Sequence, residues 1–235
     1  MLVPDYVLTD VLGSGRSCSV YLGHREDVPA EKRVIKIFNC AEDYRSEADA
    51  LTALSGSGAR VPVIHDHNEE RLVLIVGPVG IPVRPVPGGR PVSGQQLASL
   101  VETLEKAHVL GIVHRDVKPQ NIFLTTDSDT DDCIMLNDWG SSCLRDSQQT
   151  FVGTYGYCDP RAQGQVLGRC TADADLRGLV RTAFVMYTGL APPHDRKFAE
   201  EFWAGWFIDG TIWWRAMDCA DRLDYDELRV LFKQL

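Results

Sequence analysis

The sequence predicts an α+β fold with two lobes: a small β-rich N-terminal lobe that carries one helix, and a mainly helical C-terminal lobe. Short runs of β-branched and aromatic residues gather before residue 77, whereas segments with helical periodicity dominate after residue 93. The stretch between them is rich in glycine and proline, which is typical of a connector. We therefore expect an N-terminal lobe over 1–77, a hinge and connector over 78–92, and a C-terminal lobe over 93–235.

Composition limits the classes of function. The chain has 235 residues, of which 44% are hydrophobic and 24% charged, as in an ordinary globular protein with a well-buried core. Its net charge of −9 argues against a nucleic-acid or anionic-membrane surface, because such surfaces need a basic patch. No signal peptide is visible, and the most apolar run, LVLIVGPVGIPV, is too short and too broken to span a bilayer. Seven cysteines without a CxxC pair fit free thiols in a reducing compartment, so we expect the cytoplasm or the nucleus.

The N-terminal lobe should contain about five strands and one helix. Two β-prone runs flank a glycine-rich turn within 6–25, and KRVIKIF, 32–38, reads as a third strand. The segment 41–54 predicts a helix, because four of its apolar residues share one face at helical spacing: Tyr44, Ala48, Leu51 and Leu54. After a break at GSGARVP, the runs 61–66 and 71–76 predict two more strands.

The C-terminal lobe should begin with a helix over 93–111, which Gly111 ends. Its apolar stripe is formed by Leu97, Leu100, Val101 and Leu104. Residues 122–136 predict a hairpin whose acidic tip is expected to be a solvated loop. Two helical blocks, roughly 172–189 and 197–235, complete the chain.

The stretch GSGRSCSV, 13–20, lies between two expected strands. A dinucleotide-binding turn opens a helix, whereas this turn returns as a strand. A glycine loop between strands can fold over the phosphates of a nucleotide and offer them backbone N–H groups. Glycines also mark ordinary hairpins, so the stretch alone leaves both interpretations open.

Lys36 lies inside the apolar strand VIK, and a buried lysine is unfavourable unless its charge is paired. Glu47 is on the following helix, on the side that also carries Leu51 and Leu54. An ion pair between Lys36 and Glu47 would orient the amine toward phosphate oxygens. The alternative is an unpaired surface lysine at a strand edge.

Two polar stretches follow apolar runs in the C-terminal lobe. IVHRDVKPQNIFL, 112–124, places a histidine, an arginine, an aspartate, a lysine and an asparagine within eight positions. In NDWG, Asp138 follows the strand IML and is either a turn former or a hard oxygen ligand for Mg²⁺. Each stretch alone also fits an ordinary loop, so their order along the chain decides between the alternatives.

Glycine loop, strand lysine, helix glutamate, HRD with a following asparagine, and DWG occur here in the order found in protein kinases. Over nearly its whole length the chain resembles the eukaryotic-type protein kinase family. The resemblance includes the pattern GT-x-x-Y-x-x-P, formed by Gly153, Thr154, Tyr157 and Pro160, and a long hydrophobic segment between Asp175 and Gly189. Lys118 followed by Pro119 is similar to the Ser/Thr-directed form of the loop. The stretches LVLIVGPVG and NDWGS also resemble the compact kinase domains of Crinkler-type effectors.

The resemblance implies ATP and Mg²⁺ as cofactors and a protein as substrate. Asp116 would accept or orient the proton of the attacking hydroxyl, Lys118 would hold the γ-phosphate, and Asn121 and Asp138 would ligate Mg²⁺. Nucleotide binding is expected from Gly13, Ser14, Gly15, Val20, Lys36 and Glu47. Thr150 is the expected phosphorylation site, and the C-terminal helices offer a possible partner surface. The gatekeeper is one of Leu74, Ile75 and Val76.

Two departures from the family pattern leave the activity open. Cys18 replaces the third glycine of the loop, which reduces the room above the phosphates. Arg161 replaces a glutamate that in the family makes a buried ion pair near the chain end. We expect Arg161 to pair in reversed polarity with an acid of the last helices: Asp218, Asp221, Asp224 or Glu227. The alternatives to an active protein kinase are a pseudokinase that binds nucleotide and partners, and a kinase of small molecules.

Overall fold

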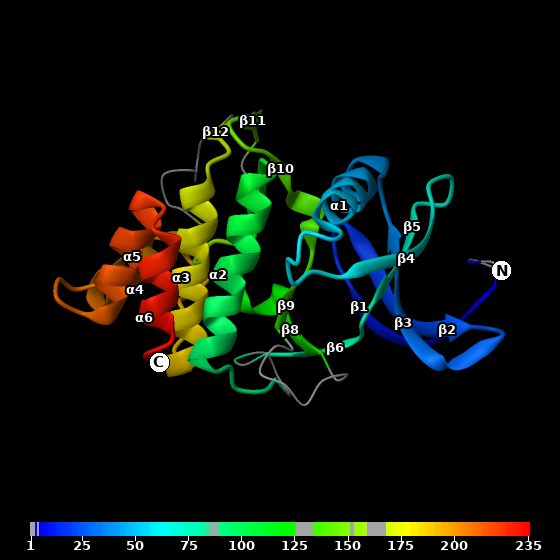
Figure 1. The fold of residues 1–235 in the computed structure, drawn as a ribbon, viewed down its shortest axis with the longest axis horizontal. Coiled ribbons are helices and arrows are strands. Elements are labelled where there is room, and N and C mark those ends of the chain that lie inside the picture. Colours follow the sequence, from blue (N-terminus) through cyan, green and yellow to red (C-terminus); the bar gives the residue numbers. More distant parts are fainter. Residues whose placement is uncertain are drawn as a thin grey trace.

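The computed structural model describes residues 3, 5–83, 85, 89–125, 134–150, 153–158 and 168–235. It has two lobes, with the strands β1–β5 and helix α1 at one end and the helices α2–α6 at the other (Figure 1). This arrangement confirms the α+β, two-lobed fold that the sequence predicts. The tip of the 122–136 hairpin, residues 126–133, lies outside the described residues.

The N-terminal lobe is a five-stranded sheet in the order β1-β2-β3-β5-β4, with all neighbours antiparallel. Its elements are β1 (Tyr6–Ser14), β2 (Cys18–Arg25), β3 (Val28–Phe38), α1 (Ala41–Leu54), β4 (Val63–Asn68) and β5 (Val73–Gly77). On β5, Leu74 and Val76 belong to the main core together with α1 and the C-terminal lobe, whereas Ile75 packs into a separate cluster on the other face. A gatekeeper must face the C-terminal lobe, and Ile75 points to the opposite face of the sheet, so Leu74 and Val76 remain as candidates.

The sequence predicts only a glycine- and proline-rich connector between the lobes, but part of this connector forms a strand. Gly80–Pro82 forms strand β6, which pairs with β8 (Ile122–Thr125), and β8 pairs with β9 (Ile134–Leu136). A Cβ on Gly80 would lie 2.7 Å from Cβ of Phe123. Glycine thus allows the two strands to approach, and this long-range pairing leaves no local periodicity that sequence reading could detect.

The C-terminal lobe contains α2 (Gly94–Val109), α3 (Ala172–Thr188), α4 (Arg196–Trp206), α5 (Ile212–Arg222) and α6 (Tyr225–Phe232). The block expected over 197–235 is therefore three helices. The first break has Gly210 at φ +83° and Thr211, whose hydroxyl caps α5 by accepting from the backbone N–H of Trp214. At the second, Leu223 adopts φ +56° and Asp224 caps α6. An N-cap residue starts a helix because its side chain accepts a backbone N–H group that would otherwise be unpaired.

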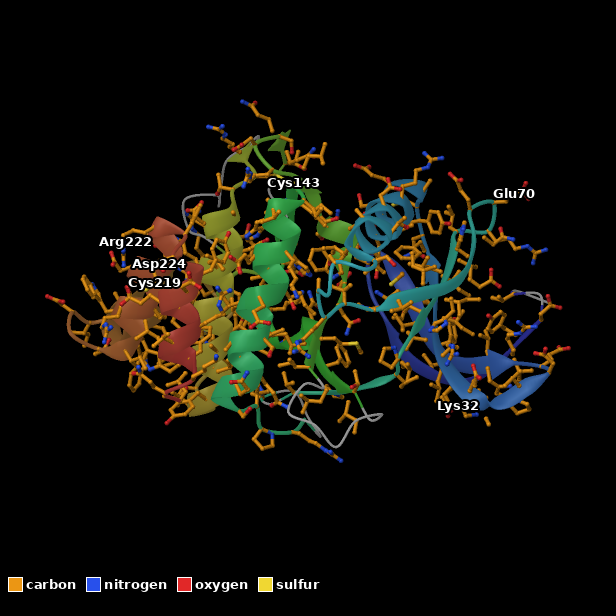
Figure 2. The ribbon with its side chains drawn as sticks, in the orientation of Figure 1. Lys32, Glu70, Cys143, Cys219, Arg222 and Asp224 are labelled. Carbon is orange, nitrogen blue, oxygen red and sulfur yellow. A yellow bond between two sulfur atoms is a disulfide. The ribbon has the colours of Figure 1, made fainter. Side chains whose placement is uncertain are left out.

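Short strands order the polar segments beside these helices: β7 (Ile112–Val113), β10 (Cys143–Leu144), β11 (Gln148–Gln149) and β12 (Gly168–Arg169). β10 pairs with β7, and β11 pairs with β12. These two pairings bring Cys143 and Cys170, which are 27 residues apart in the sequence, into a disulfide. Figure 2 labels Cys143 at the start of β10. The expectation of free thiols is thus wrong for this pair, whereas Cys18, Cys40 and Cys219 are free thiols in the structure.

The part of the chain that the structure describes holds no helix that is both long enough and apolar enough to cross a membrane.

Gly94 provides a test of how α2 and α6 dock. A Cβ at this position would collide with the backbone carbonyl of Phe232, whereas a Cβ on Gly205, in the middle of α4, meets nothing within 4 Å. Gly94→Ala should therefore lower the free energy of unfolding by about 1–3 kcal/mol through overpacking. Gly205→Ala should raise it by about 0.5–1 kcal/mol, the gain in helix propensity. Urea unfolding measures both variants, and equal midpoints for the two would contradict the docking of α6 against the start of α2.

Candidate active site

One buried carboxylate, that of Asp175, binds the start of the polar loop 114–121. Asp175, near the start of α3, is 1% exposed and accepts hydrogen bonds from the backbone N–H groups of His114 (2.6 Å) and Arg115 (2.7 Å). Nε2 of His108 on α2 lies 3.0 Å from the same carboxylate. Burial alone would raise the pKa of Asp175, but the hydrogen bond and charge of His108, with those from His114, hold it below its ordinary value. Asp175 therefore stays ionised and fixes the start of the loop.

Asp116, Lys118 and Thr154 form a closed hydrogen-bonded triangle. Lys118 Nζ donates to Asp116 Oδ2 at 2.6 Å and to Thr154 Oγ1 at 2.8 Å, and Thr154 Oγ1 donates to Asp116 Oδ1 at 2.8 Å. All three residues line one cleft. Sequence reasoning named Asp116 and Lys118 but gave Thr154 no role at this site, although its GT-x-x-Y pattern was a usable signal.

Asn121 ends the short 3₁₀ helix η1 (Pro119–Asn121) and is 5% exposed. Its Nδ2 donates to the backbone carbonyl of Asp116 at 2.8 Å and lies 3.4 Å from Asp116 Oδ2. Asn121 is thus tied to Asp116, and its backbone carbonyl accepts from the N–H of Asn137, the residue before Asp138.

Asp138 follows β9 in a left-handed conformation, with φ +64° and ψ +66°. The next residue, Trp139, is fully buried, and its indole N–H donates to the carbonyl of Leu136 at 2.9 Å. The ring of His114 stands edge-on to the indole, with centroids 4.6 Å apart. His114 and Trp139 are both buried in the core, and their packing fixes the backbone from which Asp138 lines the cleft.

The expected ion pair between Lys36 and Glu47 is present, with Nζ and Oε1 2.5 Å apart. The Lys36 side chain is 8% exposed and that of Glu47 is fully buried. Burial alone would lower the pKa of Lys36, but the carboxylates of Glu47 and Asp138 outweigh it, so the pKa lies above its ordinary value. Lys36 therefore remains a cation. Oε2 of Glu47 has no hydrogen-bond partner among the described atoms.

The glycine loop joins β1 to β2 above these groups. Gly13, Ser14, Gly15 and Val20 line the same cleft as Asp116, Lys118 and Asp138, and the cleft has a volume of about 1030 Å³. Cys18, the first residue of β2, also lines it. Burial, only partly offset by Lys36, raises the pKa of Cys18 to about 11, so this side chain is a neutral thiol.

Arg115 connects the 114–121 loop to Thr150. Its guanidinium group donates to the backbone carbonyls of Ser141 (3.2 Å) and Thr150. Burial lowers the pKa of Arg115, and Asp175 opposes that effect. Thr150 itself is exposed at the edge of the cleft. The structure thus brings the Arg115 cation next to Thr150, the expected phosphorylation site.

Pro160 and Arg161 lie outside the described residues, so the expected ion pair of Arg161 remains a prediction. Each of its four candidate partners already contacts an arginine of the C-terminal helices. Asp218, Asp224 and Glu227 bind Arg222, which Figure 2 labels beside Asp224, and Asp221 binds Arg177.

Comparison with known proteins adds independent findings. Residues 91–203 match the family model described as the protein kinase domain. The chain is 27% identical over 218 residues to calcium/calmodulin-dependent protein kinase type 1 of Macrobrachium nipponense, covering 84% of this chain and 60% of the relative. It is 31% identical over 212 residues to serine/threonine-protein kinase Pkn1 of Myxococcus xanthus, covering 81% of this chain and 30% of the relative. The chain thus spans between 30% and 60% of the length of these relatives.

The fold also matches a solved structure of the CAK complex from Chaetomium thermophilum bound to ATP-γ-S. The TM-score is 0.67 at 20% sequence identity, and the match covers 83% of this chain and 66% of the other. At this identity the match concerns the fold alone.

Proposed function

Because the chain belongs to the eukaryotic-type protein kinases, we propose that it transfers the γ-phosphoryl group of ATP, with Mg²⁺, to serine or threonine hydroxyls of protein substrates. The observation that carries the proposal is the Asp116–Lys118–Thr154 triangle, which faces the same cleft as the glycine loop and Asp138. Phosphoryl transfer asks for little covalent chemistry from the protein and depends on positioning and on stabilisation of charge. This cleft supplies the carboxylates of Asp116 and Asp138 and the ammonium group of Lys118 for both purposes.

Asp116 is suited to receive the acceptor hydroxyl. Its two carboxylate oxygens are oriented by Lys118 and Thr154, and its backbone carbonyl is held by Asn121. A carboxylate fixed in this way can orient the hydroxyl and take its proton. Lys118 would remain beside Asp116 and bind the oxygens of the group in transfer. Lys36, held by Glu47, would bind phosphate oxygens from the other lobe.

The residues present fit a magnesium ion. Asp138 and Asn121 offer a carboxylate and an amide oxygen, the hard ligands that Mg²⁺ takes together with phosphate oxygens and water. The left-handed backbone at Asp138 presents its carboxylate from the end of β9. When bound, Mg²⁺ neutralises the charge of the phosphates.

The glycine loop fits a nucleotide because the protein itself does not require its glycines. A Cβ on Gly13 would meet no atom within 4 Å, and one on Gly15 would meet only the Cys18 carbonyl at 3.9 Å. Neither residue has a left-handed backbone, where glycine is favoured. By contrast, a Cβ on Gly23 would lie 2.5 Å from the Val7 carbonyl, so that glycine is needed for packing. A bound ligand that approaches the backbone closely is one physical reason for glycine at 13 and 15.

The alternative is a pseudokinase, and one observation favours it. The side chain of Cys18 occupies space in the cleft, which would weaken nucleotide binding. Against a pseudokinase, the chain keeps all five residues expected to bind phosphate and metal or to accept the proton: Lys36, Glu47, Asp116, Asn121 and Asp138. A kinase of small molecules is disfavoured by the HRD-x-K pattern. Transfer of labelled phosphate from ATP to the protein itself and to a generic basic protein separates the three.

Three substitutions test the catalytic assignment. Lys36→Met, Asp116→Asn and Asp138→Ala should each reduce phosphate transfer at least about 100-fold, because each removes a group that positions or stabilises the reacting atoms. Only Asp138→Ala should also abolish the Mg²⁺ dependence of nucleotide binding. Circular dichroism serves as the control for folding. Turnover near wild type in Asp116→Asn would refute the assignment.

The glycine loop gives a second prediction. Gly13→Ala should leave the melting temperature unchanged and raise the KM for ATP, since its methyl group enters space that no protein atom fills. Gly23→Ala, the matched control, should lower the melting temperature. Cys18→Gly should lower the KM for ATP by opening the cleft. An unchanged KM in both Gly13→Ala and Cys18→Gly would place the nucleotide elsewhere.

Thr150 is the expected site of autophosphorylation. A phosphate adds a charge of about −2, and Arg115 already reaches the Thr150 backbone. Phosphorylation should therefore order the segment around Thr150 and raise activity. Mass spectrometry of active protein should find phosphate on Thr150, with Ser141, Ser142, Ser147 and Thr154 as competitors. Fully active protein without phosphate at Thr150 would contradict the prediction.

A further inference from the structure

Helix α3 presents a buried arginine to the turn 154–158. Arg181 is 5% exposed, and its Nη1 donates to the backbone carbonyls of Tyr157 (3.2 Å) and Cys158. Its guanidinium carbon lies 5.7 Å from the ring centroid of Trp203 on α4. A buried cation is unfavourable unless polar groups surround it. Here the carbonyl groups of the turn and the face of an indole ring stabilise its charge.

Trp203 supplies a second donor to the same turn. Its indole N–H donates to the carbonyl of Gly156 at 2.6 Å, and the side chain is held edge-on against Phe184 with centroids 5.5 Å apart. Gly156 has φ +98°, and a Cβ there would lie 3.0 Å from Pro192. Three successive carbonyls, from 156 to 158, therefore receive side-chain donors from α3 and α4.

The turn leads directly to the reacting groups. The backbone N–H groups of Tyr157 and Cys158 both donate to the carbonyl of Thr154, at 3.0 and 3.1 Å. The hydroxyl of Thr154 in turn binds Asp116 and Lys118. A displacement of the carbonyls at 156–158 would thus reach Thr154 through two hydrogen bonds and a short length of backbone.

Helix α3 also binds the 114–121 loop, which carries Asp116 and Lys118. Asp175 accepts the N–H groups that start the 114–121 loop, and the hydroxyl of Thr182, next to Arg181, donates to the Val117 carbonyl at 3.2 Å. Gly178 lies between the two segments, where a Cβ would be 3.3 Å from the Val117 carbonyl and 3.7 Å from that of Tyr157. One helix therefore sets the distance between the loop and the turn.

We propose that Arg181 and Trp203 are positioning residues that fix the turn 154–158, and through it Thr154, so that a protein substrate binds with its hydroxyl opposite Asp116. The inference rests on the proposed phosphoryl transfer. On this proposal, Arg181 and Trp203 affect the binding of the protein substrate and not that of the nucleotide. They act through the turn and contact neither substrate.

The test separates the two substrates of the reaction. Arg181→Met should lower kcat/KM for a serine- or threonine-containing peptide about ten-fold or more, as expected when a charged group loses its hydrogen bonds. The KM for ATP should stay within two-fold of wild type. Trp203→Phe keeps the aromatic packing and should have a smaller effect in the same direction. Arg181→Lys keeps the charge without the planar donor group and should recover part of the loss. Arg196→Met, an exposed arginine on α4, is the matched control and should change neither parameter.

Hydrogen exchange gives a readout that does not need activity. In Arg181→Met the amides of Tyr157 and Cys158 should exchange faster, whereas the amides in the middle of α3 should not. If wild-type protein transfers no phosphate but this pattern is found, the proposed function fails and the positioning of the turn stands. If Arg181→Met and Trp203→Phe both keep the wild-type kcat/KM for the peptide and the wild-type exchange, the inference is overturned. Arg181→Lys and Trp203→Phe keep the test available if Arg181→Met does not fold.

Discussion

The buried carboxylate of Asp175 is the constraint on which the rest of the site depends. It is placed by α3, which runs through the main core, and it binds the backbone of His114 and Arg115 rather than their side chains. A buried anion that loses these donors would be strongly destabilising, so the start of the loop cannot move without a large energetic cost. Asp175 thus fixes the start of the loop that carries Asp116 and Lys118.

That anchor also explains how the site keeps an unfavourable backbone. Arg115 and Asp138 have φ values of +74° and +64°, and such residues cost about 1–3 kcal/mol each unless the surroundings fix them. Asp175 fixes the first, and the buried indole of Trp139, bonded to Leu136, fixes the residue after the second. In exchange for this strain, Arg115 reaches toward Thr150, and the carboxylate of Asp138 lines the cleft. At the site, Arg115 and Asp138 are thus strained residues whose side chains depend on this backbone for their direction.

Features that depend on residues close in the sequence could be predicted, whereas features that depend on contacts between distant segments could not. The helix 41–54 and the pairing of Lys36 with Glu47 were predictable, because periodicity and the unfavourable burial of a lysine are local or nearly local arguments. Strand β6 and the Cys143–Cys170 disulfide were not, since both arise from pairings between distant segments. Thr154 was visible as part of a motif, but its bonds to Asp116 and Lys118 depend on how the turn docks. Arg181 had no signal, because an arginine in a helix ordinarily faces solvent.

The last helix extends the same network to the end of the described chain. The hydroxyl of Tyr225 lies 2.8 Å from Nδ1 of His108, whose other nitrogen faces Asp175, and Arg229 pairs with Glu105 on α2. Because α6 is short, it is too small to be stable by itself and depends on these contacts and on packing against α2 and α5. The dependence runs in both directions, since α6 closes over His108 and shields its bond to Asp175 from water. A hydrogen bond in such a dry setting is stronger than one at the surface. The C-terminal helix is therefore part of the support of the 114–121 loop, although none of its residues lines the cleft.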